Sequence, residues 1–214
     1  YEKALPLCEE CFRQRKTVLG EKHPDTLHSI NNLAALYYSQ GDHGKALSLY
    51  DERLELMKAA FGKSHPDTLD SMNGLAALYD DRGDYDKALP LYEECLSERK
   101  LVLGDNHPDT LHSMYNLAGL YNHQGEYEKA LTLLEQCLSH REEILGADHP
   151  DTLRAMNNLA IMYDNQREYD KALPLYEDCL KRRKLVLGDN HPDTLYSKNN
   201  LASSYNNQGE YEKA

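Results

Sequence analysis

HPDTLHSMYNLAGLYNHQGE, residues 107–126, contains the start, the body and the end of one predicted helix. Its apolar residues have the i, i+3, i+4, i+7 spacing of an amphipathic helix: Leu111, Met114, Leu117, Ala118 and Tyr121. A proline in the first turn loses no hydrogen bond, because the first N–H groups of a helix have no partner within it. The aspartate after it complements the positive end of the helix dipole, and the threonine can cap a free N–H group. HPDT is therefore predicted to be a helix start signal rather than a catalytic or metal-binding group.

The tetrad recurs with a constant spacing of 42 residues, at 23–26, 65–68, 107–110, 149–152 and 191–194. Each 42-residue unit also holds a second amphipathic segment, such as 85–103, so it predicts two antiparallel helices. We expect an all-α array of helix pairs that fills residues 1–214 without a linker or a second domain. Its parts are a second helix at 1–19, pairs at 24–61, 66–103, 108–145 and 150–187, and a first helix at 192–208. The first residues already have the pattern of a helix interior, so we expect a fragment of a longer protein.

Charge and composition exclude several kinds of partner. The formal net charge is −12 and no basic stripe is present, so nucleic acid and anionic membranes are disfavoured. A neutral or basic protein or peptide is expected instead. No apolar run approaches the roughly 20 residues that span a bilayer.

Cysteines 11, 95, 137 and 179 lie 42 residues apart or a multiple of it, with Arg53 at the missing point. One cysteine per repeat does not supply pairs for disulfides, so small packed side chains in a reducing, cytoplasmic compartment are expected. No metal or cofactor motif stands out, and no cofactor is expected.

The five copies can be compared with one another, column by column. Leucine at 33, 75, 117, 159 and 201 never varies, which is typical of packing, whereas other columns of the first helix diverge along one helical stripe. These divergent positions are predicted to contact ligand side chains: His28, Asp70, His112, Arg154 and Tyr196, then Tyr38, Asp80, Asn122, Asp164 and Asn206. A neutrally drifting, solvated face is the alternative. The acidic members of the stripe outnumber Arg154, which disfavours acidic peptides.

A row of asparagines lies between these columns. Its members are Asn31, Asn32, Asn73, Asn116, Asn157, Asn158, Asn199 and Asn200, with Tyr115 in one copy. Asparagine is a mediocre helix former, so a mid-helix row of them indicates a role for the carboxamide. One role is hydrogen bonding to the backbone of an extended peptide, and the other is a hydrogen-bond ladder between adjacent repeats.

The unit ALPLYEECLSERKLVLGDNHPDTLHSMYNLAGLYNHQGEY, residues 88–127, resembles a tetratricopeptide repeat of the kinesin light chain type. The residues that carry the resemblance are Leu117, Ala118, Tyr121, Gly125, Tyr127 and Ala130, and the stretch 195–214 is similar to a late repeat of kinesin light chains. The resemblance covers the whole chain. It implies a right-handed superhelical α-solenoid whose first helices line a concave peptide-binding groove, with the asparagines on the ligand backbone.

These observations favour a non-enzymatic interaction module, because no nucleophile–base pair or phosphate-binding loop is evident. A motor cargo adaptor, the repeat array of a signalling ATPase and a purely structural array that stacks end to end are the alternatives. The oligomeric state and the identity of the ligand stay open.

Overall fold

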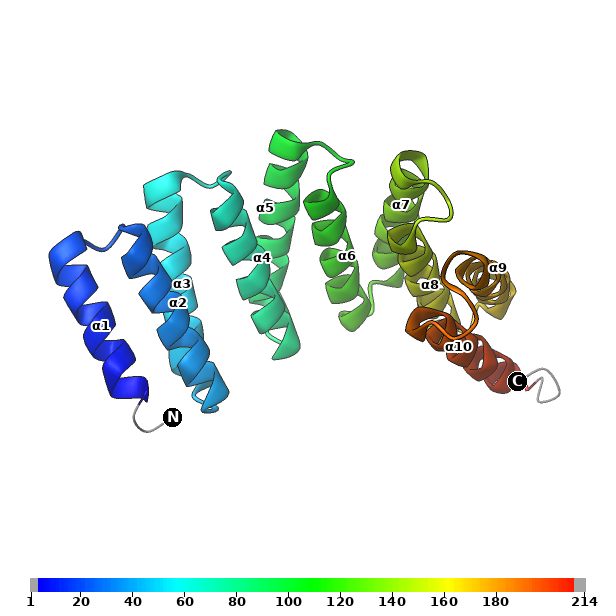
Figure 1. Cartoon of the computed structure of the whole chain (residues 1–214), viewed down its shortest axis with the longest axis horizontal. Coiled ribbons are helices and arrows are strands. Elements are labelled where there is room, and N and C mark those ends of the chain that lie inside the picture. The colour runs from blue at the N-terminus through cyan, green and yellow to red at the C-terminus, as the bar shows by residue number, and fades with distance from the viewer. Residues whose placement is uncertain (1–3, 210–214) are drawn as a thin grey trace. The chain divides into compact units, whose positions relative to one another are not determined.

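The computed structural model describes residues 4–209, and these form ten α-helices joined by short turns. Figure 1 labels these helices and colours them in chain order. They are α1 (Ala4–Leu19), α2 (Pro24–Ser39), α3 (His43–Phe61), α4 (Pro66–Asp81), α5 (Tyr85–Leu103), α6 (Pro108–His123), α7 (Tyr127–Leu145), α8 (Pro150–Asn165), α9 (Tyr169–Leu187) and α10 (Pro192–Gln208). The predicted all-α array of helix pairs is confirmed.

The array divides into two compact units, one ending at Gly104 and the other beginning at Asp105. Unit 1 contains α1 to α5 and unit 2 contains α6 to α10. Within each unit every helix packs on its neighbours in sequence, and in unit 2 α8 also contacts α10. The first helices are therefore α2 and α4 in unit 1, and α6, α8 and α10 in unit 2.

The start of each first helix differs in one respect from the expectation. Histidine, not threonine, is the N-cap: Nδ1 of His23, His65, His107, His149 and His191 accepts a hydrogen bond from the backbone N–H two residues later, at 3.1 to 3.3 Å. The threonine side chains point inward and are fully buried. Four of the five threonine hydroxyls have no hydrogen-bond partner among the described residues, so threonine fills space against the preceding helix. The predicted threonine cap was wrong, because the histidine ring accepts the hydrogen bond from the free N–H group while the threonine side chain is buried.

Side-chain hydrogen bonds join each second helix to a neighbouring first helix, and they recur with the 42-residue period. The thiols of Cys95, Cys137 and Cys179 each donate to the carbonyl of a leucine 26 residues earlier, at 3.2 to 3.7 Å. First-helix tyrosines donate to a carboxylate 28 residues earlier, as Tyr37 does to Glu9 and Tyr79 to Asp51. All five cysteines are free. These bonds satisfy the polar groups that the helix crossings bury.

The turn after each first helix needs a left-handed residue. Glycine meets this need at 41, 83, 125 and 209, with φ between 76° and 87°, whereas Arg167 has φ of 63° in the remaining copy. A side chain in this region costs about 1 kcal/mol relative to glycine. Among the described residues no helix is long and apolar enough to cross a membrane.

Candidate functional site

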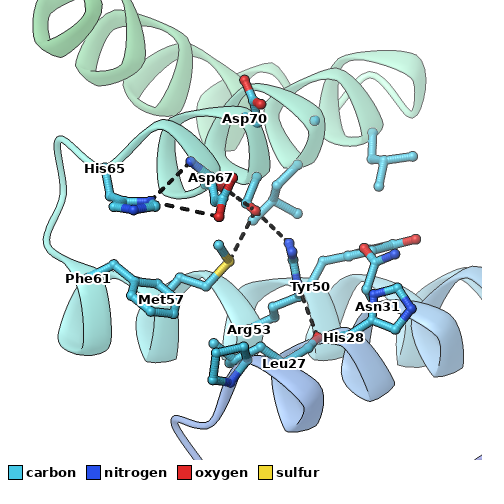
Figure 2. A pocket seen from close by; sticks show the side chains of 15 residues that line it. Leu27, His28, Asn31, Tyr50, Arg53, Met57, Phe61, His65, Asp67 and Asp70 are labelled. Carbon is cyan, nitrogen blue, oxygen red and sulfur yellow. Dashed lines mark hydrogen bonds and ion pairs between the residues drawn. The ribbon is translucent and has the colours of Figure 1, made fainter. Parts of the chain in front are cut away.

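Unit 1 has a depression of about 850 Å³ between α2, α3 and α4. Three of the sequence-predicted site residues line it: His28, Asn31 and Asp70. Figure 2 shows them around the same hollow as Tyr50 and Arg53, which come from the second helix α3. Gly74 stands where other copies have asparagine, and this leaves the hollow open on the α4 side.

Arg53 connects the three helices of this depression. Its Nε donates to the carbonyl of Leu27 at 3.2 Å, and its Nη1 donates to the hydroxyl of Ser71 (Figure 2). Burial lowers the pKa of the guanidinium, although an arginine stays charged. On the opposite wall Asp70 forms an ion pair with Arg99, whose side chain is buried. The walls of the unit 1 depression therefore carry charges of both signs.

Unit 2 has a depression of about 370 Å³ between its first and second helices. The sequence-predicted residues in its lining are more numerous than in unit 1: His112, Tyr115, Arg154, Asn157, Asn158 and Tyr196. Tyr115 and Tyr196 are about half exposed, at 42% and 52%, so their rings are available to a bound chain. Arg154 is held by an ion pair to Asp151 at 2.9 Å.

Two further arginines line this depression from the second helices. Arg141 of α7 and Arg183 of α9 occupy equivalent positions, and only 8% and 4% of their surface is exposed. Their Nη1 atoms donate to the carbonyls of Asp151 and Asp193, at 2.8 and 2.7 Å. Burial raises the pKa of the neighbouring Cys137 thiol, against the opposing effect of Arg141. Arginine charge thus lies at the floor of the hollow, next to a thiol that stays protonated.

The asparagine row divides between the two roles. Asn157 is 1% exposed, and its Oδ1 accepts from Ser197 Oγ and from Asn200 Nδ2, both at 3.3 Å. These bonds join α8 to α10, so for Asn157 and Asn200 the ladder between repeats is the role that the structure describes. Asn73 is also buried, whereas Asn31 and Asn158 are half-buried, line the depressions and have no hydrogen-bond partner among the described residues.

Other predicted positions lie outside the two depressions. Tyr38 packs edge-on against His43 with ring centroids 4.6 Å apart, Asp164 accepts from Ser204 Oγ at 2.7 Å, and Asn116 contacts His112 at 3.3 Å. The remaining members are exposed or half-buried along the first helices: Asn32, Asp80, Asn122, Asn199 and Asn206. The structure therefore brings together the first divergent column and part of the asparagine row, but not the later column.

Sequence reasoning missed the second-helix residues of both linings, Tyr50 and Arg53 in unit 1 and Arg141 and Arg183 in unit 2. A signal was present, because arginine recurs on the 42-residue lattice at 15, 99, 141 and 183. Met57 interrupts that column in the one copy where Arg53 interrupts the cysteine column. Within the range 4–209 no group of three His, Cys, Asp or Glu side chains is arranged to hold a metal ion.

The fold and the repeat define the class of protein. The family model for the tetratricopeptide repeat matches residues 1–59, 31–100, 67–143, 109–184 and 165–214, so the chain belongs to the tetratricopeptide repeat family. No curated protein matches the chain.

Among solved structures, the chain is similar to a putative kinesin light chain with nearly identical TPR-like repeats from Podosopora anserina. That likeness has 28% identity and a TM-score of 0.77, and covers 89% of this chain and 90% of the other. BtubC (BKLC) from P. vanneervenii is similar at 25% identity and a TM-score of 0.78, over 100% of this chain and 86% of the other. The resemblance to kinesin light chain repeats is thereby confirmed, and repeats of this family generally serve protein interaction.

Proposed function

We propose that the chain is a non-enzymatic binding module, in which the depression of each unit holds an extended peptide segment. The observation that carries the proposal is the lining itself. Positions that diverge between copies, such as His28, Asp70 and Arg154, lie beside asparagines within the same hollows. Divergent side chains beside asparagines that recur in most copies suit a surface that recognises different ligand side chains along a common peptide backbone.

The unpaired carboxamides supply the backbone contacts. Asn31 and Asn158 are half-buried and each offers a donor and an acceptor, which match the C=O and N–H groups of an extended chain. Each carboxamide would exchange bonds to water for bonds to the peptide backbone, which typically gains about 0.5–1.5 kcal/mol per bond. Tyr115 and Tyr196 add apolar surface with a polar tip at the rim of the unit 2 depression.

A motor cargo adaptor is the second candidate, and the likeness to a putative kinesin light chain at 28% identity favours it. An adaptor needs the same peptide site plus a second binding element, such as a heptad coiled coil. A heptad region in the parent sequence would support the adaptor, and a nucleotide-binding P-loop would point to a signalling array instead. Both candidates fit a reducing compartment, since all five thiols are free.

A peptide array, followed by titration of the best peptides against matched variants, tests the proposal. Asn31→Ala and Asn158→Ala remove carboxamides that make no hydrogen bond to another residue in the range 4–209. The melting temperature should therefore hardly change, while peptide affinity falls about tenfold. Asn32→Ala and Asn199→Ala are the controls, because these asparagines are exposed and outside the depressions. Equal affinity in all four variants, or no peptide bound by the wild type, would contradict the proposal.

A further inference from the structure

Two helices lack a neighbour that the other helices of their type have. Each of the first helices α2, α4, α6 and α8 packs on the second helix that follows it. Among the described residues α10 packs only on α8 and α9, which precede it, and α1 packs only on α2, which follows it. Within the range 4–209, α10 therefore has an open face where a second helix belongs, and α1 has one where a first helix belongs.

The open face of α10 exposes apolar side chains that are buried elsewhere. Leu195 is 52% exposed, whereas the leucines at the equivalent position of the four other first helices are at most 3% exposed: Leu27, Leu69, Leu111 and Leu153. A hollow of about 430 Å³ between α9 and α10 is lined by Leu180 and Leu201, among others. Their equivalents in unit 1, Leu54 and Leu75, are buried. Covering such a surface stabilises an assembly, because apolar area is removed from water.

The open face of α1 exposes the cysteine of its repeat. No residue of α1 is buried, and Cys11 is exposed. In contrast, Cys95, Cys137 and Cys179 are buried, and each donates to the carbonyl of a leucine 26 residues earlier, on the preceding first helix. The Cys11 thiol lacks that leucine carbonyl among the described residues.

The repeat places the sequence of α1 directly after α10. YEKA at 211–214 repeats YEKA at 1–4, and ALPLCEEC at 4–11 differs in one residue from ALPLYEEC at 88–95 in α5. We infer that α1 of one copy of this chain packs on α10 of a second copy, in the way that α5 packs on α4. The Cys11 thiol then donates to the Leu195 carbonyl of the second copy, as Cys95 donates to the carbonyl of Leu69.

Charged side chains support the same register. Lys58 of α3 lies 3.1 Å from Glu94 of α5, so an ion pair bridges successive second helices. Lys184 of α9 stands in the column of Lys58, and Glu10 of α1 stands in the column of Glu94. Packing of α1 on α10 therefore brings Glu10 of one copy opposite Lys184 of the other. Such an exposed pair adds little free energy, but it favours the correct alignment.

This contact uses different faces on the two copies, so it can join further copies in a row. One helix pair is a small interface, and the expected dissociation constant is about 10–100 µM. The inference does not depend on the proposed peptide binding, because neither Leu195 nor Cys11 lines a depression.

Sedimentation velocity of the chain in reducing buffer, from about 5 to about 500 µM, tests the inference. Leu195→Asp disrupts the α10 face and Cys11→Asp the α1 face. Both side chains are exposed in the single copy, so the melting temperatures should match the wild type. Leu101→Asp, at an exposed leucine of α5 outside both faces, is the control. The mean mass of the wild type and of the control should rise with concentration, and each of the other two variants should associate about 10-fold more weakly or less.

An equimolar mixture of the two interface variants distinguishes head-to-tail packing from other self-association. The intact α10 of Cys11→Asp meets the intact α1 of Leu195→Asp, so the mixture should form a 1:1 complex that does not grow further. A second readout needs no variant. Alkylation of Cys11 in the wild type should slow as the protein concentration rises, because the contact buries the thiol.

Three results would overturn the inference. One is a wild type that stays monomeric with unchanged Cys11 alkylation over the whole range, in which case another segment or another protein covers the α10 face. Another is association of Leu195→Asp equal to that of the wild type. The last is a mixture without a complex although both variants melt like the wild type.

Discussion

The Nε atom of Arg53 lies 3.2 Å from the carbonyl oxygen of Leu27, where the corresponding atom in three other copies is a cysteine sulfur. Four residues later the exchange is reversed, because Met57 stands where those copies have a buried arginine. Arg53 reaches Ser71 from its new position, and Ser71 also contacts the Met57 sulfur at 3.2 Å. The two replacements therefore compensate for each other around one serine.

This relationship predicts a strong coupling in a double-mutant cycle. Arg53→Cys alone removes the donor to Ser71, and Met57→Arg alone adds a second buried charge, so each should lower the free energy of unfolding by about 1–3 kcal/mol. The double variant recreates the Cys–Arg arrangement of α5, α7 and α9 and should recover most of the loss. Urea unfolding measures all four proteins, and simple additivity would show that the residues act independently.

Two asparagines of one column, Asn157 and Asn199, are predicted to differ in their contribution to stability. Asn157→Ala leaves the Ser197 hydroxyl and the Asn200 amide without their acceptor in a buried position, so it should cost about 1–3 kcal/mol of unfolding free energy. Asn199→Ala, at an exposed position of the same column, should stay within about 0.5 kcal/mol of the wild type. Equal losses from thermal unfolding of the two variants would argue against the bond between α8 and α10.

The helix start predicts that histidine matters more than threonine for hydrogen bonding. His107→Ala removes the acceptor for the Asp109 N–H group and should cost about 1 kcal/mol. Thr110→Val keeps the buried volume and removes a hydroxyl that has no hydrogen-bond partner among the described residues, so it should be neutral or stabilising. Chemical denaturation of both variants, with His107→Asn as a cap-preserving control, checks the order. A larger loss from Thr110→Val than from His107→Ala would restore threonine as the cap.

Buried thiols and phenols predict a loss of stability in alkali. Burial raises the pKa of Cys137, Cys179, Tyr92 and Tyr176 in the folded chain. A group whose pKa is raised by folding contributes its full share of stability below its unfolded pKa, about 8.5 for cysteine and 10 for tyrosine, and that share is lost as the pH rises past it. The melting temperature should fall as the pH rises above about 8.5.

The same burial predicts how the thiols react. In the native protein at pH 7.5, alkylation should modify the exposed Cys11 and leave Cys137 and Cys179 intact. Mass spectrometry of the alkylated chain reads this directly. Fast modification of Cys137 or Cys179 before unfolding would contradict their burial.

The left-handed turn after α8 predicts a stabilising substitution. Arg167→Gly should raise the unfolding free energy by about 1 kcal/mol, since the four other copies have glycine there and the arginine has φ of 63°. Gly125→Arg is the reverse change in the equivalent turn and should destabilise by a similar amount. If Arg167→Gly and Gly125→Arg both stabilised or both destabilised the protein, backbone conformation would be ruled out as the cause.

The fold could be predicted from the sequence because its signals are local. The prolines at 24, 66, 108, 150 and 192 start the first helices, and the 42-residue period repeats the packing of a first helix on the following second helix four times. The candidate site was only partly predictable. Comparing columns finds positions such as Arg154 that vary. It does not tell that Asn157 is buried and bonded to α10 while its neighbour Asn158 is half-buried in the same hollow. Arg141 was missed because an arginine that recurs in four of the five copies indicates a packing position rather than a binding site.

The bonds between helices also bear on how quickly the chain folds. The side-chain bonds described above join residues at most 43 positions apart, from the thiol–carbonyl bonds at 26 to the Asn200–Asn157 bond at 43. Most contacts lie within a helix or between helices adjacent in sequence, which gives a low relative contact order, and little loop entropy is lost before each contact forms. Any repeat can thus start the process and its neighbours can add to it in either direction. During synthesis, repeats made earlier can therefore begin to fold before later ones have left the ribosome.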